Sequence, residues 1–201
     1  MGRRYLGGWF IHKNKINNTM PTLLKEDLKN ILDLFEKNKS DYPYFVETGT
    51  YMGETILRFI DDFEKSYTIE LSENFFNQFN KKDYNRDKLK SILGDSSKKL
   101  KEVIDEIYGN TIFFLDGHFS QCGTAKGEKD VPLFEELKII NNFFKYECLI
   151  IIDDLRLFGT NTGEDWTSVS KENLLKILEN RIDSYFELND RFIIHSKNSE
   201  N

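Results

Sequence analysis

One segment decides the fold of this chain: Tyr44-Phe45-Val46-Glu47-Thr48-Gly49-Thr50-Tyr51-Met52-Gly53-Glu54-Thr55. It begins as a short run of β-branched and aromatic residues, which is typical of a buried strand. A turn with Gly49 and Gly53 follows, and then an apolar helical pattern. Glycines let a ligand approach the backbone and let a helix pack tightly. A strand, a glycine turn and a helix in this order predict a loop that binds a nucleotide-like cofactor.

Four more short apolar runs follow along the chain, with helical patterns between them. Such runs predict an α/β fold with a parallel sheet that is covered by helices. Each of the five runs ends on an acid, and these acids are Glu47, Glu70, Asp95, Asp116 and Asp153. Parallel sheets bind their ligands at the carboxyl ends of the strands. The row of acids therefore predicts a ligand or metal site at that edge.

The composition limits the class of protein. With 201 residues and no internal repeat or linker, residues 1–201 are expected to form a single domain. Residues 1–40 are expected to form an arm and a helix that cap it. The first 20 residues carry four basic side chains and no acid, namely Arg3, Arg4, Lys13 and Lys15. This arm is either a mobile terminus or a contact for an anionic substrate.

Charge and hydropathy exclude two kinds of partner. A net charge of −6 argues against a general nucleic-acid binder, which needs a basic surface. No apolar run reaches the roughly 18–20 residues that cross a bilayer, so no membrane partner is expected. The two cysteines, Cys122 and Cys148, have no metal-like spacing, which favours a reduced cytoplasmic compartment. The 17 phenylalanines favour a homodimer, although the sequence leaves the oligomeric state open.

The glycine turn discriminates between two cofactors. A dinucleotide site reads G-x-G-x-x-G and holds a pyrophosphate, whereas this turn has three residues between Gly49 and Gly53. Glu47 would repel a pyrophosphate and attract the ammonium and sulfonium of S-adenosylmethionine (SAM). Glu70 can accept hydrogen bonds from ribose hydroxyls, a feature that dinucleotide enzymes share. Asp95 and Ser96 can meet the adenine amino group. The alternative is that these acids only cap helices.

The chain resembles class I SAM-dependent methyltransferases in five segments between about residues 43 and 155. They are Glu47-Thr48-Gly49-Thr50-x-x-Gly53-x-Thr55, Glu70, Gly94-Asp95, Leu115-Asp116-Gly117 and Ile152-Asp153-Asp154. The chain is most similar to the macrocin O-methyltransferase type, the metal-dependent sugar and antibiotic O-methyltransferases. The resemblance implies a doubly wound, Rossmann-like sheet of seven strands in the order 3-2-1-4-5-7-6, with the last strand antiparallel. It also implies that SAM contacts Glu47, Thr48, Gly49, Thr50, Gly53, Thr55, Glu70, Asp95, Ser96 and Asp116.

In that strand order Asp116 lies near Asp153 and Asp154, because strands four and five are neighbours. Three carboxylates suit an oxygen-loving ion such as Mg²⁺. A divalent ion on the acceptor hydroxyl would lower its pKa and fix its position. The resemblance assigns the ligand role to these three acids. Neighbouring strand residues point to opposite faces, so Asp153 and Asp154 can both be ligands only if the strand has ended.

One residue departs from the related enzymes, which usually read L-D-G-D where this chain has Leu115-Asp116-Gly117-His118. A histidine at the catalytic end of a strand is a candidate general base, with a structural role as the alternative. Asp116 and His118 are therefore the candidate catalytic residues. His12 and His195 have no such context, and we interpret both as incidental.

Three basic residues follow the proposed site. Lys126 and Lys129 are expected on a solvated loop, with a pocket for an anionic acceptor as the alternative. Arg156 is expected to pair with one of the acids, since an arginine lowers the pKa of a neighbouring carboxyl group.

The sequence thus predicts a cytoplasmic SAM-dependent O-methyltransferase, assisted by Mg²⁺ and acting on a hydroxyl of a small polar acceptor such as a sugar. Two alternatives stay open. One is an oxidoreductase that uses NAD or NADP. The other is a non-catalytic module that binds SAM or a partner and whose acids only hold loops.

Overall fold

The computed structural model describes residues 22–118, 131–161 and 163–199. Their strands are β1 (Tyr44–Thr48), β2 (Lys65–Glu70), β3 (Leu89–Leu93), β4 (Thr111–Leu115), β5 (Cys148–Ile152), β6 (Ile182–Leu188) and β7 (Arg191–Ser196). Their helices are α1 (Lys25–Leu34), α2 (Glu54–Phe59), α3 (Glu73–Phe79), α4 (Ser96–Ile104), α5 (Leu133–Phe143) and α6 (Lys171–Leu178). Two short 3₁₀ turns complete the set, η1 (Lys39–Asp41) and η2 (Leu155–Leu157).

All seven strands join one sheet in the order β3-β2-β1-β4-β5-β7-β6. Strands β1 to β5 are parallel, and β7 runs antiparallel to both of its neighbours, β5 and β6. The strand order and the antiparallel last strand that the resemblance implies are therefore confirmed. The predicted closing hairpin is also present. It turns at Asn189 and Asp190, whose positive φ angles of 49° and 64° suit a two-residue turn between twisted strands.

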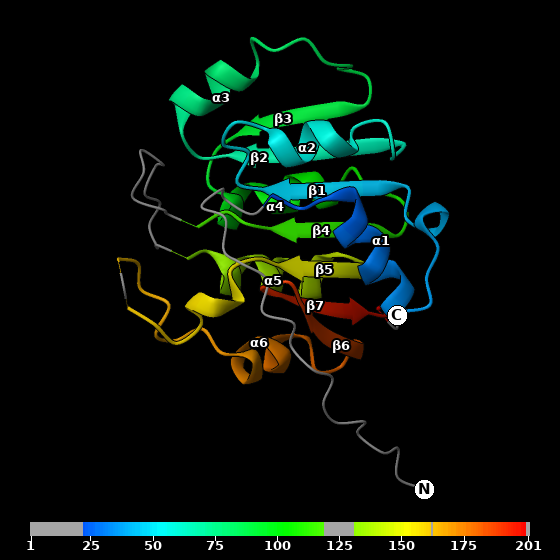
Figure 1. The fold of residues 1–201 in the computed structure, drawn as a ribbon, viewed down its shortest axis with the longest axis vertical. Coiled ribbons are helices and arrows are strands. Elements are labelled where there is room, and N and C mark those ends of the chain that lie inside the picture. Colours follow the sequence, from blue (N-terminus) through cyan, green and yellow to red (C-terminus); the bar gives the residue numbers. More distant parts are fainter. Residues whose placement is uncertain (1–21, 119–130, 162, 200–201) are drawn as a thin grey trace, which may run out of the picture.

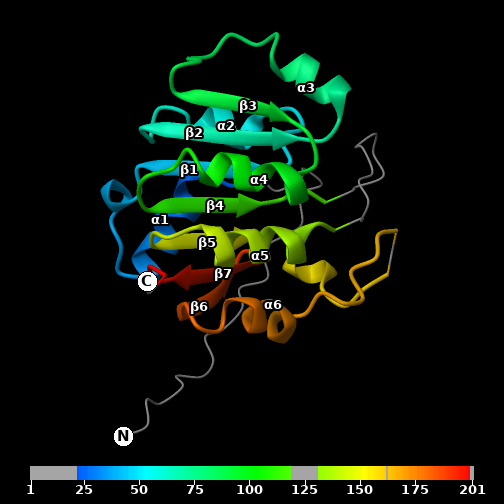
Figure 2. The same ribbon diagram turned by 180° about the vertical axis from the view of Figure 1, so that it is seen from behind.

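Helices cover both faces of the sheet. Helices α1 and α2 lie on one face (Figure 1), and α4, α5 and α6 lie on the other (Figure 2). Strand β1 is apolar on both sides because both of its faces are buried. Phe45 packs under α1 and α2, whereas Val46 packs in the cluster on the opposite face. A strand that is buried on both faces reads as a continuous apolar run. This is the signal by which the parallel strands were predicted.

The N-terminal helix packs against the sheet. Leu28, Ile31 and Leu32 of α1 are buried in the same cluster as Ile151 of β5. The arm at residues 1–21 lies outside the described residues, so the predicted cap stays a prediction. Within the described part of the chain, no helix combines the length and apolarity that a bilayer crossing needs.

Candidate active site

The predicted site residues gather at one edge of the sheet. The arrowheads of β1 to β5 point to the same side in Figure 1, so the residues that follow these strands meet there. The half of this edge at β1, β2 and β3 carries the predicted cofactor residues. The half at β4 and β5 carries the predicted metal and catalytic residues.

The glycine turn brings β1 against the end of β4. Gly49 has φ +85°, and a Cβ atom added to it would lie 2.4 Å from the carbonyl oxygen of Asp116. Gly53 has φ +72° at the start of α2, where a Cβ atom would lie 2.3 Å from the ring of Phe79. Both positions therefore require glycine for the backbone angle and for the close approach. The predicted cofactor loop thus contacts the backbone of a predicted catalytic residue.

Glu70 fastens this turn to the end of β2. Its carboxylate accepts one hydrogen bond from the backbone N–H of Tyr51 at 2.8 Å and another from the N–H of Ser72 at 2.7 Å. The two bonds use different oxygens, and the residue is buried. Each carboxylate oxygen has two acceptor sites, so one remains on each for a ribose hydroxyl. Glu70 therefore holds the turn as well as being a candidate ribose ligand.

Glu47 lies beneath the turn and is almost inaccessible. Its carboxylate accepts a hydrogen bond from Thr68 at 2.8 Å, and the hydroxyls of Thr68 and Thr50 are 2.6 Å apart. Burial raises the pKa of Glu47 to about 8, and the charge of Glu70 adds to this, while the bond from Thr68 opposes it. At neutral pH Glu47 is therefore mostly protonated. The charge argument for a cationic cofactor applies in full only above that pKa.

Asp95 is the N-cap of α4, since its Oδ1 accepts the backbone N–H of Ser97 at 2.9 Å and the Ser97 hydroxyl at 2.6 Å. The helix-capping role that the sequence left open for these acids is thus present here. Thr48, Thr55 and Ser96, which were also predicted to contact the cofactor, are buried. They lie at the end of β1, in the first turn of α2 and at the start of α4, respectively.

On the other half of the edge, Asp116, His118 and Asp154 come together. The Nδ1 atom of His118 is 3.5 Å from Oδ1 of Asp116, and its Nε2 atom is 3.2 Å from Oδ2 of Asp154. One ligand atom from each residue lies within 4.8 Å of the other two. Burial, followed by the charges of Asp153 and Asp154, raises the pKa of Asp116 well above its ordinary value. A cation here would offset that concentration of negative charge.

Asp153 is near enough to Asp116 for its charge to act on that group, but its own carboxylate pairs with an arginine. Its Oδ1 atom lies 3.2 Å from Nε of Arg191, a buried arginine that also reaches Asp27 of α1 at 3.3 Å. Burial raises the pKa of Asp153 to about 7, although Arg191 opposes the shift. Asp153 therefore links the end of β5 to β7 and to the N-terminal helix.

Asp154 points another way because β5 has already ended at Ile152. Asp154 takes a left-handed conformation with φ 58° at the start of η2. Arg156 contacts Asp154 Oδ1 as well as Asp190, which confirms the pairing that was expected for this arginine. The arginine thereby leaves Oδ2 of Asp154 facing His118.

Three residues of the site were missed in the sequence. Glu164 has Oε2 3.8 Å from Nε2 of His118 and accepts the indole N–H of Trp166 at 2.9 Å. The ring of Trp166 meets that of His118 edge-on, with centroids 5.2 Å apart. Glu136 is buried on α5, and its Oε1 atom has no hydrogen-bond partner among the described residues. Its position between Leu133 and Ile140, on the apolar side of a helical pattern, was the signal that could have identified it.

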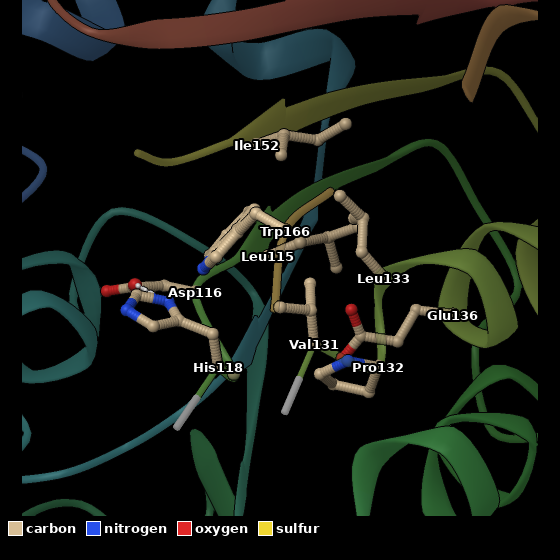
Figure 3. Close-up of a pocket in the computed structure, with 10 residues that line it drawn as sticks. Leu115, Asp116, His118, Val131, Pro132, Leu133, Glu136, Ile152 and Trp166 are labelled. Carbon is tan, nitrogen blue, oxygen red and sulfur yellow. Dashed lines mark ion pairs between the residues drawn. The ribbon is translucent and has the colours of Figure 1, made fainter. Parts of the chain in front are cut away.

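A small pocket lies beside these residues, and Glu136 and Trp166 belong to its lining (Figure 3). Its polar lining is Asp116, His118 and Glu136, and Trp166 forms part of its wall. Burial raises the pKa of Glu136 to about 7, with the nearby hydroxyls of Ser96 and Thr48 opposing the shift. The pocket thus offers two carboxyl groups and an imidazole beside an aromatic surface. Lys126 and Lys129 lie outside the described residues, so nothing tests their predicted roles.

The donor set fits a divalent cation. Asp116 and Asp154 supply carboxylate oxygens and His118 supplies an imidazole nitrogen, and these are the ligand types of Mn²⁺, Fe²⁺, Co²⁺ and Zn²⁺ sites. Two carboxylates alone also suit Mg²⁺. Asp116, His118 and Asp154 are therefore the residues that could hold an ion at this edge of the sheet.

No protein-family model matches this chain, and a search of curated proteins finds no match. Solved structures share its fold. A Staphylococcus aureus protein assigned provisionally as a caffeoyl-CoA O-methyltransferase has a TM-score of 0.57 and 17% identity, over 88% of this chain and 85% of its own. The Podospora anserina methyltransferase PaMTH1, bound to SAH, has a TM-score of 0.55 and 16% identity, over 88% and 80%.

The O-methyltransferase TomG from Streptomyces achromogenes, involved in tomaymycin synthesis and solved with SAM, has a TM-score of 0.53 and 13% identity, over 88% of this chain and 82% of its own. At such identities the likeness shows the fold alone. That fold is the Rossmann-like sheet of SAM-dependent methyltransferases, which agrees with the class that the sequence resembles.

Proposed function

We propose that this protein is a SAM-dependent O-methyltransferase that acts on a hydroxyl group of a small polar acceptor. One observation carries the proposal, namely the contact between the glycine turn and the acid–histidine group. Gly49 approaches the carbonyl oxygen of Asp116 so closely that no side chain fits between them. A methyl donor on the turn and an acceptor beside Asp116 would therefore be neighbours.

The chemistry needs the acceptor oxygen in line with the sulfonium methyl group and without its proton. Glu70 and the glycine turn would hold the cofactor, and Asp116, His118 and Asp154 would hold the acceptor hydroxyl. The pocket wall at Trp166 would exclude water from the reacting atoms. A bound divalent ion would supply one further effect, a lower pKa of that hydroxyl.

The acceptor is proposed as a small molecule because the pocket is small, and as a polar one because Asp116, His118 and Glu136 line it among apolar residues. TomG, one of the proteins with this fold, is involved in tomaymycin synthesis. A sugar hydroxyl fits the proposal, and so does an anionic acceptor, although Arg156 already contacts two carboxylates. Cytoplasmic location, a homodimeric state and the absence of nucleic-acid partners remain parts of this proposal.

Cofactor binding is the first test. SAM and S-adenosylhomocysteine should raise the melting temperature of the full chain, and NAD and NADP should not. Glu70→Gln should weaken SAM binding by roughly 1.5–3 kcal/mol, because buried hydroxyls would lose a charged partner. Glu73→Gln is the matched control, since Glu73 is an exposed glutamate in the first turn of α3. A larger shift with either dinucleotide would instead support an oxidoreductase.

Methyl transfer is the second measurement. The release of S-adenosylhomocysteine can be followed by mass spectrometry with a panel of sugars and other hydroxyl-bearing small molecules. Transfer to at least one of them supports the proposal. Tight SAM binding without transfer to any hydroxyl acceptor would point to the non-catalytic binding module.

A further inference from the structure

The imidazole of His118 is placed unlike that of a free general base. Both of its nitrogens face carboxylates, with Nδ1 directed to Asp116 and Nε2 directed to Asp154. A neutral imidazole has a single N–H, so at most one of its nitrogens can donate to an ionised carboxylate, and the other is free to share a cation with the carboxylate that it faces. In either case both ring nitrogens are directed at carboxyl groups and not at an open space beside the turn. His118 is therefore better placed to share an ion with the two carboxylates.

Asp153 already forms an ion pair with an arginine. Its carboxylate lies beside the guanidinium of Arg191, which is only 2% exposed. Using the carboxylate of Asp153 as a metal ligand would take a counter-charge away from a buried arginine, which is strongly unfavourable. The site at the ends of β4 and β5 therefore draws one carboxylate from each strand, and the third donor has to be a different residue.

We infer that Asp116, His118 and Asp154 bind a divalent first-row transition-metal ion in preference to Mg²⁺, with Asp153 outside the ligand set. Mg²⁺ takes oxygen ligands, whereas an imidazole nitrogen raises the affinity for ions such as Fe²⁺, Co²⁺ and Zn²⁺. This inference deepens the proposed function and rests on it for the role of the ion. The metal site itself can be measured without any methyl transfer.

Neighbouring side chains hold the ligands in place. Arg156 contacts one oxygen of Asp154 and leaves the other towards His118. Glu164 lies 3.8 Å from Nε2 of His118 and is itself fixed by the indole of Trp166. Such outer contacts orient metal ligands and tune their affinity. The site therefore has the supporting contacts that a chance cluster of acids lacks.

The test uses Co²⁺ as the probe with the metal-free full chain in the absence of SAM. Calorimetry should show Co²⁺ binding at least about tenfold more tightly than Mg²⁺, and the visible absorption of Co²⁺ should change on binding. His118→Ala should lose at least about tenfold in Co²⁺ affinity, and His118→Asp should narrow the preference over Mg²⁺. His195→Gln is the matched control, because it removes a buried histidine at the other end of the sheet and should leave Co²⁺ binding unchanged.

Three results would overturn the inference: Mg²⁺ binding as tightly as Co²⁺, His118→Ala retaining full Co²⁺ affinity, or no binding of either ion. Asp153→Asn should keep Co²⁺ affinity, whereas a loss as large as that of Asp154→Asn would return Asp153 to the ligand set. Melting temperatures identify any variant that fails to fold. SAM binding is measured separately. Co²⁺ binding without SAM binding would contradict the proposed function and would still support the metal site.

Discussion

Two histidines in this molecule lie between carboxylates, one at each end of the sheet. His118 follows β4 and faces Asp116 and Asp154. His195 lies on β7 opposite Leu149, near the start of β5, and its two ring nitrogens are each 3.2 Å from a carboxylate, one of Glu147 and one of Asp183. In both groups one histidine lies between two carboxylates at nearly the same distances.

Their surroundings differ in the positive charges. In the group around His195, Lys37 is 2.8 Å from Glu147, Lys197 is 2.9 Å from Asp183, and the Tyr42 hydroxyl donates to Glu147 at 2.7 Å. Among the described residues, no lysine pairs with Asp116 or Asp154, and Arg156 contacts Asp154 but divides its guanidinium between that acid and Asp190. Each acid beside His195 is thus paired with a lysine, whereas among the described residues Asp116 has only His118 as an ion-pair partner. This difference in counter-charge is the reason to expect a structural role at one end of the sheet and a role in the proposed chemistry at the other.

Removing one acid from each group should separate the two roles, and this is the largest expected effect. Asp116→Asn should lower methyl transfer by about 10²–10⁴-fold, because it weakens both the hold on the acceptor and the proton transfer. Its stability to urea should stay the same or rise, since one of several like charges disappears. Glu147→Gln should leave methyl transfer unchanged and should lower the free energy of unfolding by about 1–3 kcal/mol.

Rate measurements and urea titrations on both variants check this pair. The comparison would fail if Asp116→Asn unfolded the protein without a loss of rate per folded molecule. It would also fail if Glu147→Gln slowed methyl transfer as much as Asp116→Asn does.

Glu136 sharpens the comparison, because it is a carboxyl group with no ion-pair partner among the described residues. Burial raises its pKa to about 7, above the ordinary value of 4.5. The folded protein therefore keeps this proton between those two pH values while the unfolded chain releases it, so stability falls as pH rises through that window. Above pH 7 the accumulated loss should be on the order of 3 kcal/mol.

Glu136→Gln removes this titration, so the variant should gain stability relative to the parent between pH 4.5 and pH 7 and keep that gain at higher pH. Urea unfolding across this range measures it. If the difference in the free energy of unfolding between the parent and Glu136→Gln were the same at every pH in this range, Glu136 would be ionised throughout it. Glu135→Gln, on the neighbouring residue of the same helix, controls for the loss of one negative charge.

The sequence predicted the fold well because the parallel strands are buried on both faces. Short, continuously apolar runs such as Ile112-Phe113-Phe114-Leu115 indicate strands that are buried on both faces. The two residues Asn189 and Asp190 indicated the turn of the closing hairpin. The strand order did not follow from any local pattern. It came from the resemblance, and the structure confirms it.

The site was predicted less completely, for identifiable reasons. Strand ends are visible in the sequence, and the strand order that the resemblance implies then placed Asp116 beside Asp153 and Asp154. The sequence could not separate Asp153 from Asp154, since that depends on the left-handed turn at Asp154 and on Arg191, which lies 38 positions beyond Asp153. It also missed Glu164 and Trp166, because their contacts with His118 are made across the fold and leave no local signal.

The smallest expected effect concerns Glu47, the buried acid beneath the cofactor turn. Its pKa of about 8 means that it is largely protonated at pH 7, and a cationic cofactor nearby would favour its ionised form. SAM binding should therefore release a proton from Glu47. Its affinity should rise by at most about tenfold per pH unit below pH 8 and level off above it. Calorimetry between pH 6 and pH 9 measures this dependence.

Glu47→Gln separates the contribution of the protein from that of the ligand, because the amino group of SAM also titrates in this range. The amide can still accept the hydrogen bond from Thr68, so the buried network is preserved. The difference in SAM affinity between parent and variant should grow with pH up to about 8 and then stay constant. A difference that does not change with pH would mean that Glu47 keeps one protonation state on binding, and that SAM is recognised by the turn and Glu70 without the charge of Glu47.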